Sequence, residues 1–128
     1  MPQREDVLSF FSGRPGALPL YEALESRIAD AVPESRILVQ KSQIAFSCRR
    51  RFSFVSFLPV RRAALRPKDY ITVTFGLGYR LDSPRIDAVI EPYPCRWTHH
   101  VLIGSLSEID AQLLGWLVQA ADFSAAKR

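Results

Sequence analysis

The sequence lacks the features that would place it at once in a membrane, secreted or nucleotide-binding class. Its apolar runs are too short to span a bilayer, and the N-terminal run Val7–Phe11 is too short for the core of a signal peptide. Phosphate-binding loops of the Gly-x-x-x-x-Gly-Lys-Ser/Thr type and serine elbows of the Gly-x-Ser-x-Gly type are absent. We therefore expect a cytoplasmic protein without a membrane partner, and no motif identifies a reaction.

Cysteine is scarce, with only Cys48 and Cys95 in 128 residues. In a cytoplasmic protein we expect both to be buried, reduced thiols rather than a disulfide. Together with His99 and His100 they could supply four metal ligands, but Cys95-x-x-x-His99 matches no standard zinc spacing. We therefore expect neither a metal nor another cofactor.

Acidic side chains are missing from the centre of the chain. Between Glu34 and Asp69 there are nine basic residues and no acidic one, although the net charge of the whole chain is only +4. The flanking segments are therefore net acidic. Such segregation is typical of a protein that meets an anionic partner, although it can also serve solubility alone.

The chain does contain the composition of a globular protein. With 48% hydrophobic and 23% charged residues, it has enough apolar side chains for an ordinary core. No linker, repeat or low-complexity tract interrupts it, so we expect residues 1–128 to form a single α+β domain.

Apolar periodicity predicts helices at both ends of the chain. Asp6–Ser12 is predicted as a short helix and Ala17–Val32 as a longer one. A C-terminal helix is predicted to start at Ser107, which with Asp110 has the form of an N-cap followed by an acidic residue. The apolar stripe of this last helix consists of Ile109, Leu113, Trp116, Leu117 and Ala120.

Alternating or β-branched segments between these helices predict strands. They are Arg36–Gln40, Gln43–Cys48, Phe52–Leu58, Tyr70–Leu77 and Trp97–Ile103. Arg85–Ile90 is predicted to form one or two helical turns. Because helices bracket a run of strands, we expect an α+β fold. It would have a mostly antiparallel sheet of four to five strands, two N-terminal helices and a C-terminal helix packed on one face.

Three C-terminal segments form a recognisable pattern. Trp97–Ile103 places a histidine before a short strand, Ser105–Asp110 contains a serine-acid-hydrophobic-aspartate helix start, and Leu114–Ala120 carries Trp-Leu and then alanine. Upstream, Lys41–Phe46 has the form Lys-x-x-Ile-x-Phe. From about Val7 to Phe123 the chain resembles an uncharacterised bacterial family, domain of unknown function fifty-six fifty-five. The resemblance implies an α+β domain and no established activity.

The basic segment supplies the first candidates for contact with an anion. Arg49, Arg50 and Arg51 join two predicted strands, and the planar arginine fork suits phosphate oxygens. Alternatively, these arginines occupy a solvated turn. Successive turns of an antiparallel sheet often lie at opposite ends, so the basic residues at 61–68 need not join them in one patch.

Aromatic side chains are interleaved with the basic residues. Phe52, Phe54 and Phe57 follow Arg49–Arg51, a mixture that single-strand nucleic-acid binders use for stacking. The alternative is that these phenylalanines belong to the core.

Two further positions are candidates for a small-ligand site. Lys41 interrupts an apolar stretch, so it either contacts an anionic ligand or marks a turn or edge strand. His99 and His100 are adjacent on a predicted strand, so their side chains point to opposite faces. We select His99 as the histidine that could contact an anion or act as a general base. A core histidine bonded to a backbone carbonyl is the alternative.

These observations lead to three hypotheses about function. The first is a non-enzymatic binding module whose basic central segment meets an anionic partner, either nucleic acid or a phosphorylated ligand. The second is a protein–protein module, such as a homo-oligomer in which the basic centre of one copy meets the acidic flanks of another. The third is a small-molecule pocket or enzyme centred on Lys41 and His99. It requires a concave site where these two converge and the arginine clusters do not.

Overall fold

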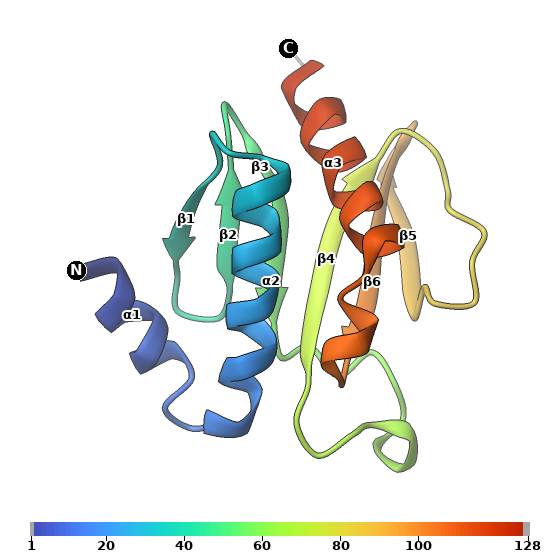
Figure 1. Ribbon diagram of the computed structural model, residues 1–128. Coiled ribbons are helices and arrows are strands. Elements are labelled where there is room, and N and C mark those ends of the chain that lie inside the picture. The colour runs from blue at the N-terminus through green and yellow to red at the C-terminus, as the bar shows by residue number, and fades with distance from the viewer. Residues whose placement is uncertain (1, 127–128) are drawn as a thin grey trace.

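The computed structural model describes residues 2–126, which form an α+β structure (Figure 1). Its helices are α1 (Pro2–Phe10), α2 (Leu18–Ala31) and α3 (Ala111–Ala126). Its strands are β1 (Arg36–Val39), β2 (Ile44–Ser47), β3 (Arg51–Ser56), β4 (Ile71–Leu77), β5 (Ala88–Tyr93) and β6 (Arg96–Ile103). Figure 1 shows α2 and α3 in front of one face of the sheet, whereas α1 lies beside β1.

The strands form one sheet of order β1-β2-β3-β4-β6-β5, in which every neighbouring pair is antiparallel. The α+β class is confirmed, and each of the five predicted strands is present within a few residues of its predicted bounds. The expected number of four to five strands is wrong, because the sheet has six.

The missed strand is β5, whose first residues fall in the segment Arg85–Ile90 that is predicted as helical turns. Ala88–Ile90 instead pair with His100–Thr98 of β6, and the register shifts between Ile90 and Tyr93. Pro92 made this strand hard to predict, because proline is uncommon in strands. It is tolerated here because β5 is an edge strand, where one side of the backbone has no partner. The turn that follows also corrects the expectation of two buried thiols. Cys95 is exposed there and has a φ of 63°, whereas Cys48 is half-buried.

The helices cover one face of the sheet because apolar residues of the inner strands alternate toward it. Val55, Val73 and Val101 lie side by side across β3, β4 and β6 and are buried. The buried side chains of α2 and α3 pack against this face. All five residues of the predicted C-terminal stripe, Ile109, Leu113, Trp116, Leu117 and Ala120, are buried.

The start of α3 differs from the predicted one. Asp110, rather than Ser107, caps the helix, because its Oδ1 accepts a hydrogen bond of 3.0 Å from the amide of Leu113. The Glu108 carboxylate instead accepts hydrogen bonds from the amides of Gly104 and Ser105 and closes the short turn before the helix. Partial burial by itself would raise the pKa of Asp110. The hydrogen bonds from the Leu113 amide and the Arg85 guanidinium outweigh it, so the pKa of Asp110 is lowered.

The opposite face of the sheet carries no helix in Figure 1, and we call it the open face. One row of this face consists of Ala45, Phe54, Thr74 and His100, one residue from each of four neighbouring strands. Near the end of β3, Phe57 joins the sheet to the helical layer. Its ring lies 5.4 Å from the rings of both Phe10 and Phe11.

No helix among residues 2–126 has both the length and the apolar character that crossing a membrane requires.

Candidate functional site

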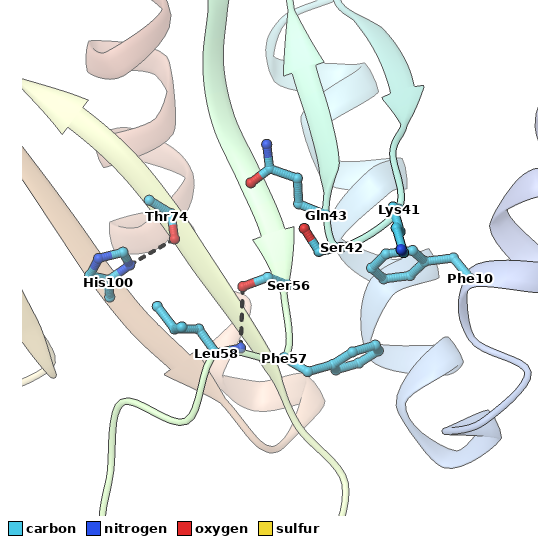
Figure 2. Close-up of a pocket in the computed structure, with 9 residues that line it drawn as sticks. All are labelled: Phe10, Lys41, Ser42, Gln43, Ser56, Phe57, Leu58, Thr74 and His100. Atoms are coloured by element: carbon cyan, nitrogen blue, oxygen red, sulfur yellow. Dashed lines mark hydrogen bonds between the residues drawn. The ribbon is translucent and has the colours of Figure 1, made fainter.

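A groove of about 560 Å³ lies on the open face, within the size range of small-molecule sites (Figure 2). Its polar lining comes from the β1–β2 turn and from three strands. Lys41, Ser42 and Gln43 belong to the turn, Ser56 to β3, Thr74 to β4 and His100 to β6. Phe10, Phe57 and Leu58 add apolar surface. The groove therefore combines one permanent cation, several hydrogen-bonding groups and an apolar wall.

The two adjacent histidines lie on opposite faces of the sheet, as strand geometry predicts. His100 pairs with Thr74 and lines the groove, whereas His99 pairs with Phe75 on the face that the helices cover. His99 is 0% exposed, and its Nε2 accepts a hydrogen bond of 3.0 Å from the amide of Leu81. Lys41 therefore shares the groove with His100 and not with His99, the histidine selected from the sequence.

His99 has a structural environment. Its ring stacks on that of Phe75, with centroids 5.2 Å apart, and Phe75 in turn stacks on Trp116. Burial lowers the pKa of His99 below its ordinary value, so the imidazole is neutral near pH 7. Because no part of the side chain is exposed, a ligand can reach His99 only if the packing around it opens.

His100 forms a polar pair with Thr74 inside the groove. The Thr74 hydroxyl and His100 Nδ1 lie 2.8 Å apart, and Figure 2 shows this contact at the opposite end of the groove from Lys41. Within residues 2–126, His100 Nε2 has no hydrogen-bond partner. Burial lowers the pKa of His100 as well. The pair thus keeps hydrogen-bonding capacity that a ligand can use.

Lys41 lies in the turn between β1 and β2. The turn is held by a backbone hydrogen bond of 2.8 Å from Gln40 to Gln43 and by a side-chain bond of 2.9 Å between the same residues. Lys41 is exposed and forms no ion pair with any residue that the structure describes. The turn therefore explains how a charge is accommodated after an apolar strand, and it leaves the ammonium group free for a ligand.

The basic segment does not form one patch. Arg49–Arg51 lie in or next to the β2–β3 turn, whereas Arg61, Arg62, Arg66 and Lys68 lie in the β3–β4 connection. Because these two connections leave opposite ends of β3, the clusters lie at opposite ends of the sheet. Neither cluster lines the groove. Arg61 is also already engaged, with its Nε 2.6 Å from Asp87 Oδ1.

The interleaved phenylalanines do not form a stacking platform. Phe52 is buried, and Phe57 is enclosed by Phe10, Phe11 and the Arg14 guanidinium, which lies 4.5 Å from the centre of its ring. Phe54 is half-buried on the open face. The packing of Phe52 and Phe57 agrees with the alternative that these residues serve the core.

Sequence reasoning missed Thr74, Ser56 and His100 as groove residues. The alternation in Tyr70–Leu77 had already separated Thr72 and Thr74 from Ile71, Val73 and Phe75, so a signal for Thr74 existed. The signal could not be used, because it does not say which face of the sheet stays uncovered. Within residues 2–126, no group of three or more histidine, cysteine, aspartate or glutamate side chains could hold a metal ion.

Comparison with known proteins found one family. The family model described as "Domain of unknown function (DUF5655)" matches residues 7–124. No curated protein and no solved structure matches the chain.

Proposed function

The chain belongs to the DUF5655 family of unknown function, and from the geometry of its open face we propose that it is a non-enzymatic binding module for a small organic anion. The anion occupies the groove between Lys41 and the Thr74–His100 pair. The observation that carries this proposal is that an unpaired lysine and a half-buried histidine line one cavity that the arginine clusters do not line.

The charge in the groove favours an anion. Lys41 supplies a positive charge without a carboxylate partner among the described residues, and the remaining polar lining consists of uncharged hydroxyl, amide and imidazole groups. A ligand carboxylate at the lysine gains a charge-assisted hydrogen bond, which is stronger than a neutral one.

The apolar wall favours a ligand with a hydrocarbon body. Phe10 and Phe57 stack on each other at the groove, and Leu58 is an exposed large apolar side chain next to them. Covering this surface removes apolar area from water, which stabilises the complex by roughly 25 cal/mol per Å² before the costs of association.

Binding is favoured over catalysis by the composition of the polar pair. A hydroxyl and an imidazole lie within hydrogen-bonding distance, as in a nucleophile–base pair. Among residues 2–126, however, no carboxylate forms a hydrogen bond with His100 to orient the imidazole.

Replacing Lys41 with methionine is expected to weaken the binding of phenylacetate by at least about tenfold, because a hydrogen bond to a charged group contributes about 1.5–3 kcal/mol and each 1.4 kcal/mol corresponds to about tenfold. The neutral isostere phenylacetamide should bind the natural chain and the Lys41→Met variant equally. Titrations followed by NMR chemical shifts of the groove residues measure both affinities.

Lys68→Met is the matched control, because Lys68 is also exposed and lies at the same end of the sheet but does not line this groove. Equal losses in the two lysine variants would mean that net charge, rather than the groove, attracts the anion.

The β2–β3 turn favours a second candidate function, contact with nucleic acid. Arg49, Arg50 and Arg51 are exposed and form no ion pair with any described residue. Three adjacent unpaired arginines suit consecutive phosphates, which would give affinity without sequence readout.

Changing Arg49, Arg50 and Arg51 to alanine is expected to lower the magnitude of the slope of log affinity against log salt concentration by about two for a single-stranded oligonucleotide. Fluorescence anisotropy at several salt concentrations measures the slope. A variant with Arg62 and Lys68 changed to alanine tests the opposite end of the sheet. Absence of oligonucleotide binding at low salt would eliminate this second candidate.

A further inference from the structure

The polar groups of the groove are concentrated at two separate ends. Lys41 extends from the β1–β2 turn, whereas the Thr74–His100 pair lies on β4 and β6 (Figure 2). The row Ala45, Phe54, Thr74 and His100 shows that three strand-to-strand steps separate β2 from β6. At about 4.8 Å per step, these steps amount to about 14 Å. The backbones of β2 and β6 are therefore farther apart than a compact anion such as acetate is long.

Both ends are free to bind. Lys41 has no ion-pair partner among residues 2–126, and the only hydrogen bond of the His100 imidazole there joins Nδ1 and the Thr74 hydroxyl. Ser56 lies between the two ends, but its hydroxyl already accepts a hydrogen bond of 3.3 Å from the amide of Leu58. Leu58, next to Ser56 in the groove, adds an apolar side chain to this part of the lining.

The kind of cation at the lysine end also limits the ligand. Recognition of phosphate commonly uses the arginine fork, which forms two parallel hydrogen bonds. Arginine is absent from the lining of this groove, and its permanent charge is a single ammonium group. A carboxylate, with one negative charge, matches that group better than a phosphate dianion.

We propose that the groove is a two-point site for an elongated organic anion with a carboxylate at each end and a hydrocarbon chain between them. One carboxylate binds Lys41, the other binds the Thr74–His100 pair, and the chain lies across β3 and β4. This inference rests on the proposed function, because it assigns a ligand class to the same groove.

Three ligands test the two anchors separately, each with the whole 128-residue chain. Dodecanedioate is long enough to reach both ends, dodecanoate has the same length but one carboxylate, and butanedioate has two carboxylates but cannot span the groove. Isothermal titration calorimetry with each ligand gives its affinity. We expect dodecanedioate to bind about tenfold more tightly than dodecanoate, since the second carboxylate adds a hydrogen bond that is made within the complex.

The anchors are then removed one at a time. Lys41→Met should weaken the binding of all three ligands. His100→Leu should bring dodecanedioate down to the affinity of dodecanoate and change the other two less than twofold. Thr74→Val, which keeps the shape of the side chain, should have a smaller effect in the same direction because it removes the hydrogen bond at Nδ1. Circular dichroism confirms that each variant is folded.

The outcomes distinguish the inference from the proposed function. If Lys41→Met weakens all three ligands but dodecanedioate never exceeds dodecanoate, the groove binds anions at one point and the two-point inference is overturned. If Lys41→Met leaves the binding of all three ligands unchanged, the proposed function itself is overturned. Equal sensitivity of dodecanedioate and dodecanoate to both His100→Leu and Thr74→Val would also overturn the inference.

Discussion

Replacing Phe75 with alanine is expected to destabilise the fold by about 3–5 kcal/mol, the usual cost of removing a large aromatic side chain from a packed core. Phe75 is 1% exposed on β4, one of the inner strands, and its ring lies between those of His99 and Trp116. The sheet and α3 meet at this stack, so a cavity here would loosen both layers. Urea denaturation followed by tryptophan fluorescence measures the loss.

Phe54→Ala is the control, because Phe54 lies on the neighbouring strand β3 but on the open face, where it is half-buried. Its removal should cost clearly less, since the site is already in contact with solvent and leaves no closed cavity. Equal costs for the two substitutions would contradict the assignment of Phe75 to the core and of Phe54 to the open face.

Stability is expected to fall as the pH decreases through about 6.5, the ordinary pKa of histidine. Burial lowers the pKa of both His99 and His100, so in this range the unfolded chain binds protons that the folded chain does not. The stabilisation is therefore complete above about pH 6.5 and is lost below it, with a slope of at most about 1.4 kcal/mol per pH unit for each histidine. Urea denaturation at a series of pH values measures this slope.

Single substitutions assign the slope to its source. His99→Gln should remove the part of the slope that comes from the buried His99. The side-chain oxygen of the new glutamine can still accept the hydrogen bond from the Leu81 amide. His100→Gln should remove the part that comes from the groove. Asp110 does not interfere, because its lowered pKa places its effect at still lower pH. If both variants keep the full slope, neither histidine is its origin.

The open face connects these stability arguments with binding. A carboxylate bound near His100 would favour the protonated imidazole, and would therefore raise the pKa of His100. The same ligand would have no direct route to His99, which lies on the other face beneath the helices. Ligand should therefore reduce the pH dependence that comes from His100 and leave that from His99 unchanged.

Local sequence patterns predicted most of the secondary structure. Tyr70–Leu77 alternates clearly and Trp97–Ile103 ends in a short apolar, β-branched run, so β4 and β6 were predicted within one residue of their observed bounds. The edge strand β5 was missed because Pro92 and Pro94 indicate an extended passage outside a sheet, although its single partner, β6, follows it directly. Asp110 was placed inside the helix rather than at its start because two overlapping serine–acid patterns, Ser105–Glu108 and Ser107–Asp110, compete for the same role.

The candidate site was less predictable than the fold. Lys41 was identified because a charge after an apolar strand is conspicuous, and the structure brings it to the groove. The separation of the two histidines followed from the period of a strand, but the sequence could not say which one faces the helices. Likewise, the basic segment is continuous in sequence, yet its two clusters lie apart because they occupy the connections at opposite ends of β3.

The sequence by itself determined the α+β class, the apolar faces of α2 and α3, five of the six strands and the opposite orientation of His99 and His100. These features depend on residue periods of two or about 3.6, which are local. Only the tertiary structure decided that the helices cover the face of His99, that Lys41 and His100 share a groove and that the basic clusters lie at opposite ends of the sheet. Those features depend on strand order and on the choice of the covered face, which arise from contacts between residues far apart in the chain.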